Sequence, residues 1–469
     1  MPDTAGISRN DRSDRSQPNV IVFFTDQQRW DTSSLHGNPL DLMPNFERLA
    51  RRGTHLAHHV TCQPVCGPAR SCLQTGRFAT QTGCYRNGIP LATDAVTLAT
   101  EFDRAGYHTG YIGKWHLGGV KPSWDRDRQE PVPVDRRGGY REWLAVDHLE
   151  FSSDAFDTRL FDTDNSEVRL PGYRVDALTD AAIRFVDHHQ TEPFFLFLSF
   201  LEPHHQNSRD DYPAPPGYDE RYRGAWVPPD LQHLGGSTAR HLSGYYGMVK
   251  RLDEALGRLL DALHSLTLTD NTIVLFTSDH GNHFKTRNGE YKRSCHESSI
   301  RVPTALQGPG FDGGGEIRQL TSIVDLMPTL LDAAGIDIPK TVSGRSILPS
   351  LKGESPWPED VFVQISESQV GRAVSTRRWK YSVVAPDADP VQDSSADRYE
   401  EEFLYDLSSD PYELQNLIHE PAYRPVADRM RRRLQGWIEA IEGTSPEIVP
   451  APPGPATGQQ VVLPREIDE

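Results

Sequence analysis

Three continuous apolar runs, each followed by polar residues, do most to constrain how this chain can fold. The runs are Val20 to Phe24, Phe194 to Leu201 and Thr272 to Thr277, and they are rich in β-branched or aromatic side chains. Runs of this length without alternation are typical of strands buried on both faces of a parallel sheet. Segments with a helical pattern, such as Tyr173 to His188 and Leu242 to Leu263, lie between them. This alternation predicts a doubly wound α/β sheet, in which ligands bind just past the carboxyl ends of the strands.

The same patterns predict further elements along the chain. We expect a strand over Tyr107 to Ile112 and helices over Pro44 to Arg52 (ended by Gly53 at C′), Leu98 to Ala105, and Leu326 to Ala334 (with Asp325 as N-cap). Residues 120–172 have weak periodicity and residues 212–229 are rich in proline, so we predict long loops for both.

The pattern changes at about Trp357, where short strand-like runs replace the long alternation. The runs Val361 to Ile365, Lys380 to Val384 and Phe403 to Asp406 precede a helix over Ala427 to Ile441. We therefore predict a disordered tail over residues 1–18, a catalytic domain over 19–350, a smaller α+β subdomain over 351–442 and a proline-rich tail over 443–469, which we also expect to be disordered.

The net charge restricts the classes of partner. Lys plus Arg number 49 and Asp plus Glu number 66, which gives a formal charge of −17. Because a chain this acidic binds nucleic acid or an anionic membrane surface poorly, we expect neither as a partner. No apolar run approaches the roughly 20 residues that span a bilayer. The segment Met1 to Asn19 lacks the apolar region of a secretion signal, so we expect a cytoplasmic protein, unless a leader precedes this sequence.

The segment from Cys66 to Arg77 is the strongest local motif, and it reads Cys-Gly-Pro-Ala-Arg-Ser-Cys-Leu-Gln-Thr-Gly-Arg. Pro68 suits the first turn of a helix, which puts Cys66 at the helix N-terminus, and Gly76 ends the helix-like run. Unpaired backbone N–H groups and the positive end of the helix dipole then face any anion held at Cys66.

The cysteines allow a competing interpretation, a structural zinc site. Four of the five lie close together in the sequence, at Cys62, Cys66, Cys72 and Cys84, and the fifth is Cys295. There is no Cys-x-x-Cys pair and no repeated zinc knuckle. An odd count without a secretion signal argues against a disulfide framework. The zinc interpretation is therefore the weaker one, and the cysteines other than Cys66 are expected to be small buried residues.

The Cys66 motif resembles the signature of the sulfatases, Cys-x-Pro-x-Arg, in which the cysteine is oxidised after synthesis to formylglycine. The similar positions continue through Leu73, Thr75, Gly76 and Arg77, and weaker matches extend the resemblance from Asn19 to about Leu417. The resemblance implies an alkaline phosphatase-like α/β fold, with a large, mostly parallel sheet sandwiched by helices and a smaller C-terminal α+β subdomain. It also implies a formylglycine-generating enzyme as a partner during maturation.

Polar residues at two predicted strand ends indicate a metal site. Asp26 and Gln27 follow the first strand, and Asp279 and His280 follow a later one. Carboxylate and amide oxygens suit Ca²⁺ or Mg²⁺, and the histidine widens the choice to Mn²⁺ or Zn²⁺. The resemblance places one divalent cation on these four residues, Ca²⁺ in first place, with Mg²⁺ or Mn²⁺ as alternatives. Gln27 replaces a second aspartate of the usual pattern, which is reminiscent of the phosphonate monoester hydrolases.

Other motifs supply candidate catalytic residues. Lys114 and His116, in the segment Gly113 to Gly118, lie two positions apart and point to the same side of an extended chain, so both can reach one anion. By resemblance to the sulfatases, His204 is the leaving-group histidine, with the adjacent His205 as the alternative. Lys292 is similarly the sulfate-binding lysine, with Arg293 as the alternative.

The resemblance implies a mechanism in which residue 66, as an aldehyde hydrate, attacks sulfur with one hydroxyl and expels sulfate by means of the other. The cation, Arg70, Lys114 and Lys292 would offset charge on the transferring group. His204 or Lys292 would protonate the leaving alcohol, and His116 would accept the proton that allows sulfate to leave.

Two short polar segments are candidates for binding the rest of the substrate. The first follows the metal motif and the second lies in the smaller subdomain; they comprise His283, Lys285 and Arg287, and Glu367, Gln369 and Arg372, respectively. The second segment is equally compatible with a solvated edge strand.

These observations predict an enzyme that hydrolyses an organic sulfate ester, with a carbohydrate as the expected alcohol, to the alcohol and inorganic sulfate. The alternatives are a phosphonate or phosphate ester hydrolase with the same site, and an unmodified pseudoenzyme that only binds sulfated ligands. The sequence leaves the alcohol, exo or endo action, and the oligomeric state open.

Overall fold

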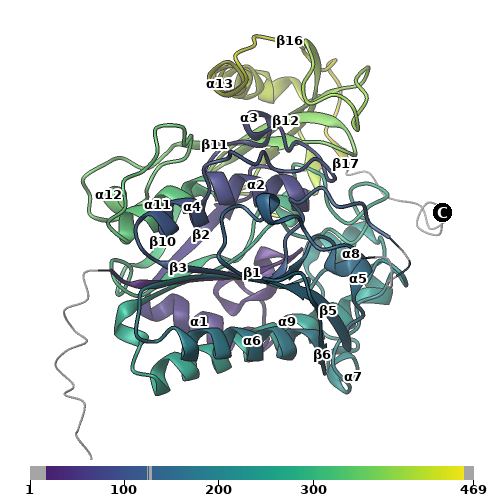
Figure 1. The fold of residues 1–469 in the computed structure, drawn as a ribbon. Helices are drawn as coiled ribbons and strands as arrows, with labels where there is room; N and C mark the ends of the chain where they lie inside the picture. Colours follow the sequence, from purple (N-terminus) through teal and green to yellow (C-terminus); the bar gives the residue numbers. More distant parts are fainter. Residues whose placement is uncertain (1–16, 124, 126–128, 459–469) are drawn as a thin grey trace, which may run out of the picture.

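The computed structural model describes residues 17–123, 125 and 129–458, so most of the predicted tail over residues 1–18 lies outside the described residues. A ten-stranded sheet forms the centre of this part of the chain (Figure 1). From one edge to the other its strands are β10 (Gly315–Ser322), β2 (Thr54–Val60), β9 (Ala305–Gln307), β8 (Thr272–Ser278), β1 (Asn19–Thr25), β7 (Phe194–Ser199), β3 (His108–Lys114), β4 (Glu142–Val146), β5 (Asp157–Asp162) and β6 (Glu167–Pro171).

β1 lies in the middle of a parallel core. It pairs with β7 on one side and β8 on the other, so that Val22 faces Phe197 and Leu275. β7 continues in parallel to β3, and β3 to β4. Every residue of β1, β7 and β8 is buried, as the apolar runs predicted. Because these strands run in the same direction, their carboxyl ends reach one edge of the sheet.

Helices cover both faces of the sheet (Figure 1). One face carries α1 (Pro44–Arg52), α6 (Arg174–His188) and α9 (Thr238–Ser265), and the other carries α2 (Cys66–Thr75), α4 (Leu98–Arg104) and α11 (Leu326–Ala333). Side chains of β1 alternate between the two hydrophobic layers, with Ile21 and Phe23 in the first and Val20 and Val22 in the second. None of the helices in the described part of the chain combines the length and hydrophobicity that crossing a bilayer requires.

The other α-helices of the part before the C-terminal sheet are short. They are α3 (Ala79–Thr82), α5 (Leu149–Ser152), α7 (Tyr218–Tyr222), α8 (Pro229–Leu234), α10 (Glu297–Ile300) and α12 (Leu348–Leu351).

A five-stranded sheet forms the smaller C-terminal part. Its strands are β11 (Asp360–Ile365), β12 (Val370–Thr376), β13 (Trp379–Ala385), β14 (Arg398–Asp406) and β16 (Glu447–Val449), and α13 (Arg424–Glu442) packs on it. Fully buried Lys380 on β13 pairs with Glu297 of α10 at 2.7 Å and with Glu413 at 2.6 Å, which ties this sheet to the catalytic part. The predicted fold class is therefore confirmed, while the domain boundaries stay a prediction.

Two predicted loops contain regular structure. Within residues 120–172, β4, α5, β5 and β6 extend the large sheet at its edge, and residues 212–229 contain α7 and the first residue of α8. β6 has no buried residue, because one side of this edge strand has no partner. An edge strand of this kind carries no apolar run, so the hydrophobic pattern could not reveal it.

The tail and two helix ends also differ from the predictions. The expected disorder from residue 443 is wrong as far as residue 458, because β16 pairs with β14, and β17 (Thr457–Gly458) pairs with β15 (Gln415–Asn416); residues 459–469 lie outside the described residues. Gly53 has φ −102° rather than a left-handed conformation, and a Cβ there would lie 2.0 Å from the Leu306 carbonyl oxygen. Asp325 is the N-cap residue of α11, as predicted, but its carboxylate accepts from the Ser322 and Arg345 amides and makes no hydrogen bond to the first turn of the helix.

Candidate active site

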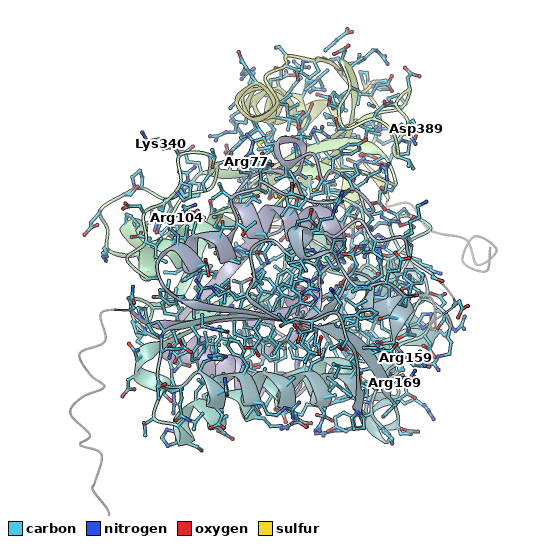
Figure 2. All side chains as sticks on the ribbon, viewed as in Figure 1. Arg77, Arg104, Arg159, Arg169, Lys340 and Asp389 are labelled. Atoms are coloured by element: carbon cyan, nitrogen blue, oxygen red, sulfur yellow. The ribbon has the colours of Figure 1, made fainter. Side chains whose placement is uncertain are left out.

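The predicted strand ends meet at one point on the sheet edge. Asp26 follows β1, Asp279 follows β8, Lys114 ends β3 and Cys66 begins α2, and all four are at most 1 % exposed. Many other charged side chains lie at the surface, such as Arg169, which points outward in Figure 2. Because this cluster is buried at the carboxyl ends of the parallel strands, where ligands bind in such sheets, it is the candidate active site.

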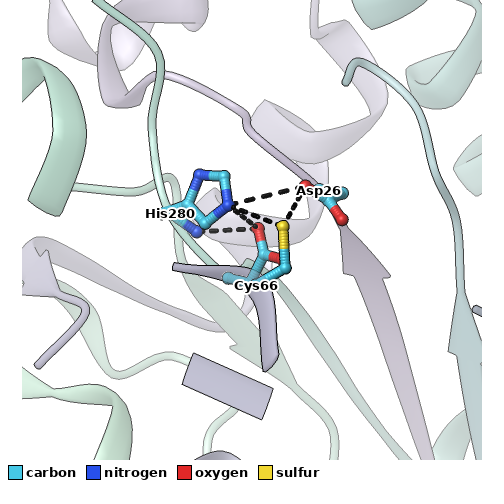
Figure 3. A group of neighbouring side chains, drawn as sticks. Asp26, Cys66 and His280 are labelled. Carbon is cyan, nitrogen blue, oxygen red and sulfur yellow. Dashed lines mark hydrogen bonds and ion pairs between the residues drawn. The ribbon is translucent and has the colours of Figure 1, made fainter. Parts of the chain in front are cut away.

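Cys66 is the first residue of α2, in agreement with the prediction. Its Sγ lies 2.8 Å from Lys292 Nζ, 3.2 Å from His280 Nε2 and 3.5 Å from Asp26 Oδ1; Figure 3 shows the last two contacts. The helix ends at Gly76, whose φ of 64° is the left-handed conformation that favours glycine.

The surroundings would make an unmodified Cys66 an acidic thiol. Burial and Asp26 act to raise the pKa of Cys66, but Lys114, Lys292 and His280 outweigh them and lower it to about 6. A site that favours negative charge at residue 66 also favours an anionic group bound beside it.

Two cations are held between the carboxylates. Lys114 Nζ lies 2.8 Å from Asp26 Oδ2, and the Arg70 guanidinium donates to Asp26 at 2.9 Å and to Asp279 at 3.3 Å. Burial acts to lower the pKa of both cations, but the neighbouring carboxylates raise the pKa of Arg70 and of Lys114 above the ordinary values. Both side chains therefore stay charged in the buried site.

The two carboxyl groups differ in their electrostatic balance. Burial opposes ionisation of Asp26, yet the charged side chains of Lys114 and Arg70 hold the pKa of Asp26 well below its ordinary value. Burial and the charge of Asp26 instead raise the pKa of Asp279 to about 7. The site thus lacks the positive charge that would keep Asp279 ionised.

The predicted metal ligands fit a divalent cation. Ligand atoms of Asp26, Cys66, Asp279 and His280 lie within 4.8 Å of one another. Gln27 is fully buried, and its side-chain oxygen and nitrogen have no hydrogen-bond partner among the described residues. His280 Nδ1–H donates to the Gly281 carbonyl at 2.9 Å, and its Nε2 faces Cys66 and Lys292. An amide group without a partner, an imidazole nitrogen that faces the cluster and a carboxyl group with a raised pKa are groups that such an ion would satisfy.

His204 rather than His205 joins the network around Cys66. His204 Nδ1–H donates to the His205 carbonyl at 2.7 Å, which leaves Nε2 to accept from Lys292 Nζ at 3.2 Å. Burial and Lys292 lower the pKa of His204 well below its ordinary value, so the ring is neutral. The His205 ring instead packs on Tyr291, with ring centroids 4.4 Å apart.

The structure also separates Lys292 from Arg293. Lys292 Nζ contacts Cys66, whereas Arg293 forms ion pairs with Glu290 and Glu367. Cys66 and Asp26 raise the pKa of Lys292 against the effect of burial, so this lysine is charged beside residue 66.

His116 lies beside the cluster without a hydrogen bond to Cys66 among the described contacts. Its backbone adopts φ 62°, and its ring centroid is 4.7 Å from that of His148. Burial and Lys114 lower the pKa of His116 well below its ordinary value, so the ring is neutral and able to accept a proton.

A cavity of about 560 Å³ opens onto Cys66. This volume is within the usual range for small-molecule sites, about 300–1,000 Å³. Its walls include several residues that the sequence motifs missed, namely Asn87, His148, Glu150, Asn207, Asp210 and Tyr291. Most of them lie on loops or short elements with no recognisable pattern, so no sequence signal could have found them.

The predicted substrate-binding residues separate into two groups. Lys285 and Glu367 line the cavity. The others bond within the protein, and their partners are the Lys292 carbonyl for His283, the Tyr412 and Glu413 carbonyls for Arg287, Glu402 for Gln369, and Glu442 for Arg372. The structure therefore does not bring His283, Arg287, Gln369 and Arg372 to this cavity, and each of these side chains bonds to another part of the fold.

Arg372 provides a test of this correction. It is 1 % exposed and lies 2.8 Å from Glu442, so Arg372→Ala should leave a buried carboxylate uncompensated. We expect the free energy of unfolding to fall by about 3–5 kcal/mol, with KM unchanged. Denaturant melts and steady-state kinetics measure both quantities. Arg318→Ala removes an exposed pair with Glu316 and should cost at most about 1 kcal/mol. A raised KM in a stable Arg372→Ala variant would contradict the correction.

Comparison with known proteins agrees with this geometry. The family model for sulfatases matches residues 18–336, and the model for the C-terminal region of N-sulphoglucosamine sulphohydrolase matches residues 289–440. The chain is 28 % identical to an ulvan-active sulfatase of Formosa agariphila, over 89 % of this chain and 80 % of the relative. It is 27 % identical to a choline-sulfatase of Rhizobium meliloti, over 86 % and 83 %, respectively.

The fold agrees as well. The crystal structure of yidJ from Bacteroides fragilis superposes with a TM-score of 0.81 at 25 % identity, and the match covers 93 % of this chain and 98 % of that one. The sulfatase family model matches more than half of this chain, and the buried site around Cys66 agrees with that match. This chain therefore belongs to the sulfatase family and is a sulfuric ester hydrolase.

Proposed function

We propose that the enzyme removes sulfate from a sulfated sugar, with formylglycine at position 66 and one divalent cation, Ca²⁺ in first place. The observation that carries the proposal is the position of Cys66 at the N-terminus of α2, within 2.8 Å of Lys292 and beside the cluster of Asp26, Asp279 and His280. A cavity large enough for a small sugar opens onto this residue. The named activity of the Formosa agariphila relative, on ulvan, supports the carbohydrate assignment.

The chain's own residues would bind and neutralise the transferring group. Lys292 contacts residue 66, and Lys114 and Arg70 contact the neighbouring Asp26. These three charged, buried side chains are therefore placed to offset negative charge on the sulfate oxygens. His204 Nε2, which accepts from the charged Lys292 Nζ, is placed to take a proton from Lys292 and pass it to the departing alcohol oxygen. His116, neutral and beside Lys114, is placed to accept a proton from residue 66.

Two groups absent from the polypeptide would complete the chemistry. Formylglycine, produced from Cys66 by a formylglycine-generating enzyme, would supply as its hydrate one hydroxyl for attack on sulfur and a second whose deprotonation releases sulfate. A cation held by Asp26, Gln27, Asp279 and His280 would supply positive charge beside the sulfate oxygens.

Gln27 favours one alternative, a phosphonate or phosphate ester hydrolase, because it removes one negative charge from the ligand set. Turnover of a panel of esters decides between a sulfatase and a phosphonate or phosphate ester hydrolase. The panel contains 4-nitrophenyl sulfate, a phosphate diester, a phosphonate monoester and pyranoside monosulfates. We expect sulfate esters to have the highest kcat/KM, with inorganic sulfate released. Preference for the phosphonate would overturn the proposal. An unmodified Cys66 without turnover of any ester would support the pseudoenzyme.

A further inference from the structure

One wall of the cavity carries three buried polar atoms without a hydrogen-bond partner among the described residues. They are His116 Nδ1, His148 Nδ1 and Glu150 Oε2, of which the last has an ion pair with Lys114 Nζ at 3.3 Å; their side chains line the cavity at 7 %, 5 % and 5 % exposure, respectively. The three side chains can bring ligand atoms within 4.8 Å of one another. Buried polar groups normally find partners, so this wall is built to meet a polar group of a ligand.

The contacts behind the wall fix what it offers. His148 Nε2–H donates to the Val120 carbonyl at 2.8 Å, which leaves Nδ1 as the ring nitrogen available to a ligand donor. Glu150 is held by Lys114 Nζ at 3.3 Å, and its backbone carbonyl accepts from Gln206 at 2.9 Å. Burial opposes ionisation of Glu150, but Lys114 lowers its pKa to about 2. An ionised carboxylate and an imidazole lone pair make an acceptor-rich wall, which needs a donor from the ligand.

Two kinds of ligand group could bind to such a wall: a metal cation, or a hydroxyl group that donates a hydrogen bond. Two imidazoles and a carboxylate are a plausible ligand set for a metal in type alone. The ammonium group of Lys114, however, already lies 3.3 Å from Glu150 and is fixed on its other side by Asp26 at 2.8 Å. A divalent ion would meet this like charge at close range, at a buried site where repulsion is weakly screened. A neutral hydroxyl donor meets no such repulsion, so the observations favour it.

The position of the wall indicates which hydroxyl group it meets. Lys114 contacts Glu150 on one side and Asp26 on the other, and Asp26 contacts Cys66. The wall therefore lies next to the place where the sulfate would sit rather than at the mouth of the cavity. Resting on the proposed function, we propose that His148 and Glu150, with His116 beside them, form a subsite that binds the sugar hydroxyl group next to the sulfated carbon. The enzyme then selects sugar sulfates with this hydroxyl free.

A cycle of enzyme and substrate changes tests this subsite. A set of methyl pyranoside monosulfates is first assayed with the metal-loaded wild type to find the best substrate. Its kcat/KM is then compared with that of the analogue that lacks the hydroxyl group next to the sulfated carbon. We expect the wild type to prefer the hydroxylated sugar about tenfold or more in kcat/KM, the range for a hydrogen bond to a charged or buried acceptor. His148→Ala should reduce this preference severalfold, and His148→Gln, which keeps an acceptor, should restore part of it. His188→Ala, an exposed histidine on α6, is the matched control.

Each outcome has a distinct meaning. An unchanged preference in His148→Ala and His148→Gln, with sugar sulfates still hydrolysed, would overturn the subsite alone. A second equivalent of divalent metal in the wild type that His148→Ala loses would also overturn it, in favour of a cation site. No activity of the wild type on any sugar sulfate, with turnover of a phosphonate ester, would overturn the proposed function and the subsite with it. Thermal melts of each variant show whether a loss of rate follows from a loss of folding.

Discussion

Cys66→Ser is expected to end multiple turnover, with a fall in kcat of about 10³-fold or more, as is usual when a covalent nucleophile is removed. Serine has one hydroxyl group, so a sulfated serine has no second hydroxyl whose deprotonation could expel sulfate. The variant should therefore transfer at most one sulfate per chain and keep it as an ester. Measurement of sulfate release, together with the intact mass of the protein after exposure to substrate, checks both expectations.

Cys84→Ser is the matched control for this substitution. Cys84 is another buried cysteine, and its Sγ donates to the Pro90 carbonyl at 3.3 Å, a bond that a serine hydroxyl can also make. We expect this variant to turn over like the wild type. Full multiple turnover by Cys66→Ser would contradict the proposed role of residue 66.

Mass spectrometry of the wild-type peptide that carries residue 66 is the complementary measurement. An aldehyde or its hydrate supports the mechanism. An unmodified thiol, with its pKa lowered to about 6, would be mostly thiolate at neutral pH and should react readily with iodoacetamide. Thiolate attack on sulfur would leave a thiosulfate with no internal route of release, so an intact thiol in a fully active preparation would overturn the mechanism.

The sequence alone was sufficient to predict the core of the fold and the centre of the site. The runs that became β1, β7 and β8 are buried on both faces, so each is apolar throughout and easy to recognise. Since parallel strands bring their carboxyl ends to one edge, Asp26 and Asp279 could be expected to meet. Local motifs then placed Cys66, Lys114 and Lys292 beside them. In the structure Lys292 contacts Cys66, and Lys114 contacts Asp26.

The parts that could not be predicted depend on tertiary contacts. Arg372 looks like a surface residue in the sequence, and only the fold supplies Glu442 as its buried partner. Glu150 lies in a segment without periodicity, yet β5 and β6 follow it and complete the sheet edge. Its pairing with Lys114 joins positions far apart in the chain, so no local pattern encodes it. Cavity walls are assembled in this way, which is why specificity was harder to predict than chemistry.

Asp279→Ala is expected to lose both the divalent cation and turnover. Asp279 is fully buried with Arg70 and the Asp26 carboxylate nearby, and burial together with Asp26 raises its pKa to about 7. A cation bound there would keep Asp279 ionised, and without this carboxylate the remaining ligands should bind it much more weakly. We expect metal affinity to fall by about 100-fold or more, since even loss of an outer-shell partner costs about 10–100-fold. Elemental analysis after dialysis measures retention directly, independently of activity.

Two variants and a chelator make the test of the ion specific. Asp270→Ala removes an exposed carboxylate before the other end of the same strand, β8, and should retain the ion like the wild type. Gln27→Asp adds a negative charge beside Asp26 and Asp279, so this variant should bind the cation more tightly. If Gln27 had only a structural role, the substitution would not strengthen cation binding. Chelator treatment should abolish sulfate release, and added Ca²⁺ should restore it. Full activity of the metal-stripped wild type, or retention of the ion by Asp279→Ala, would rule out these residues as a metal site that turnover requires.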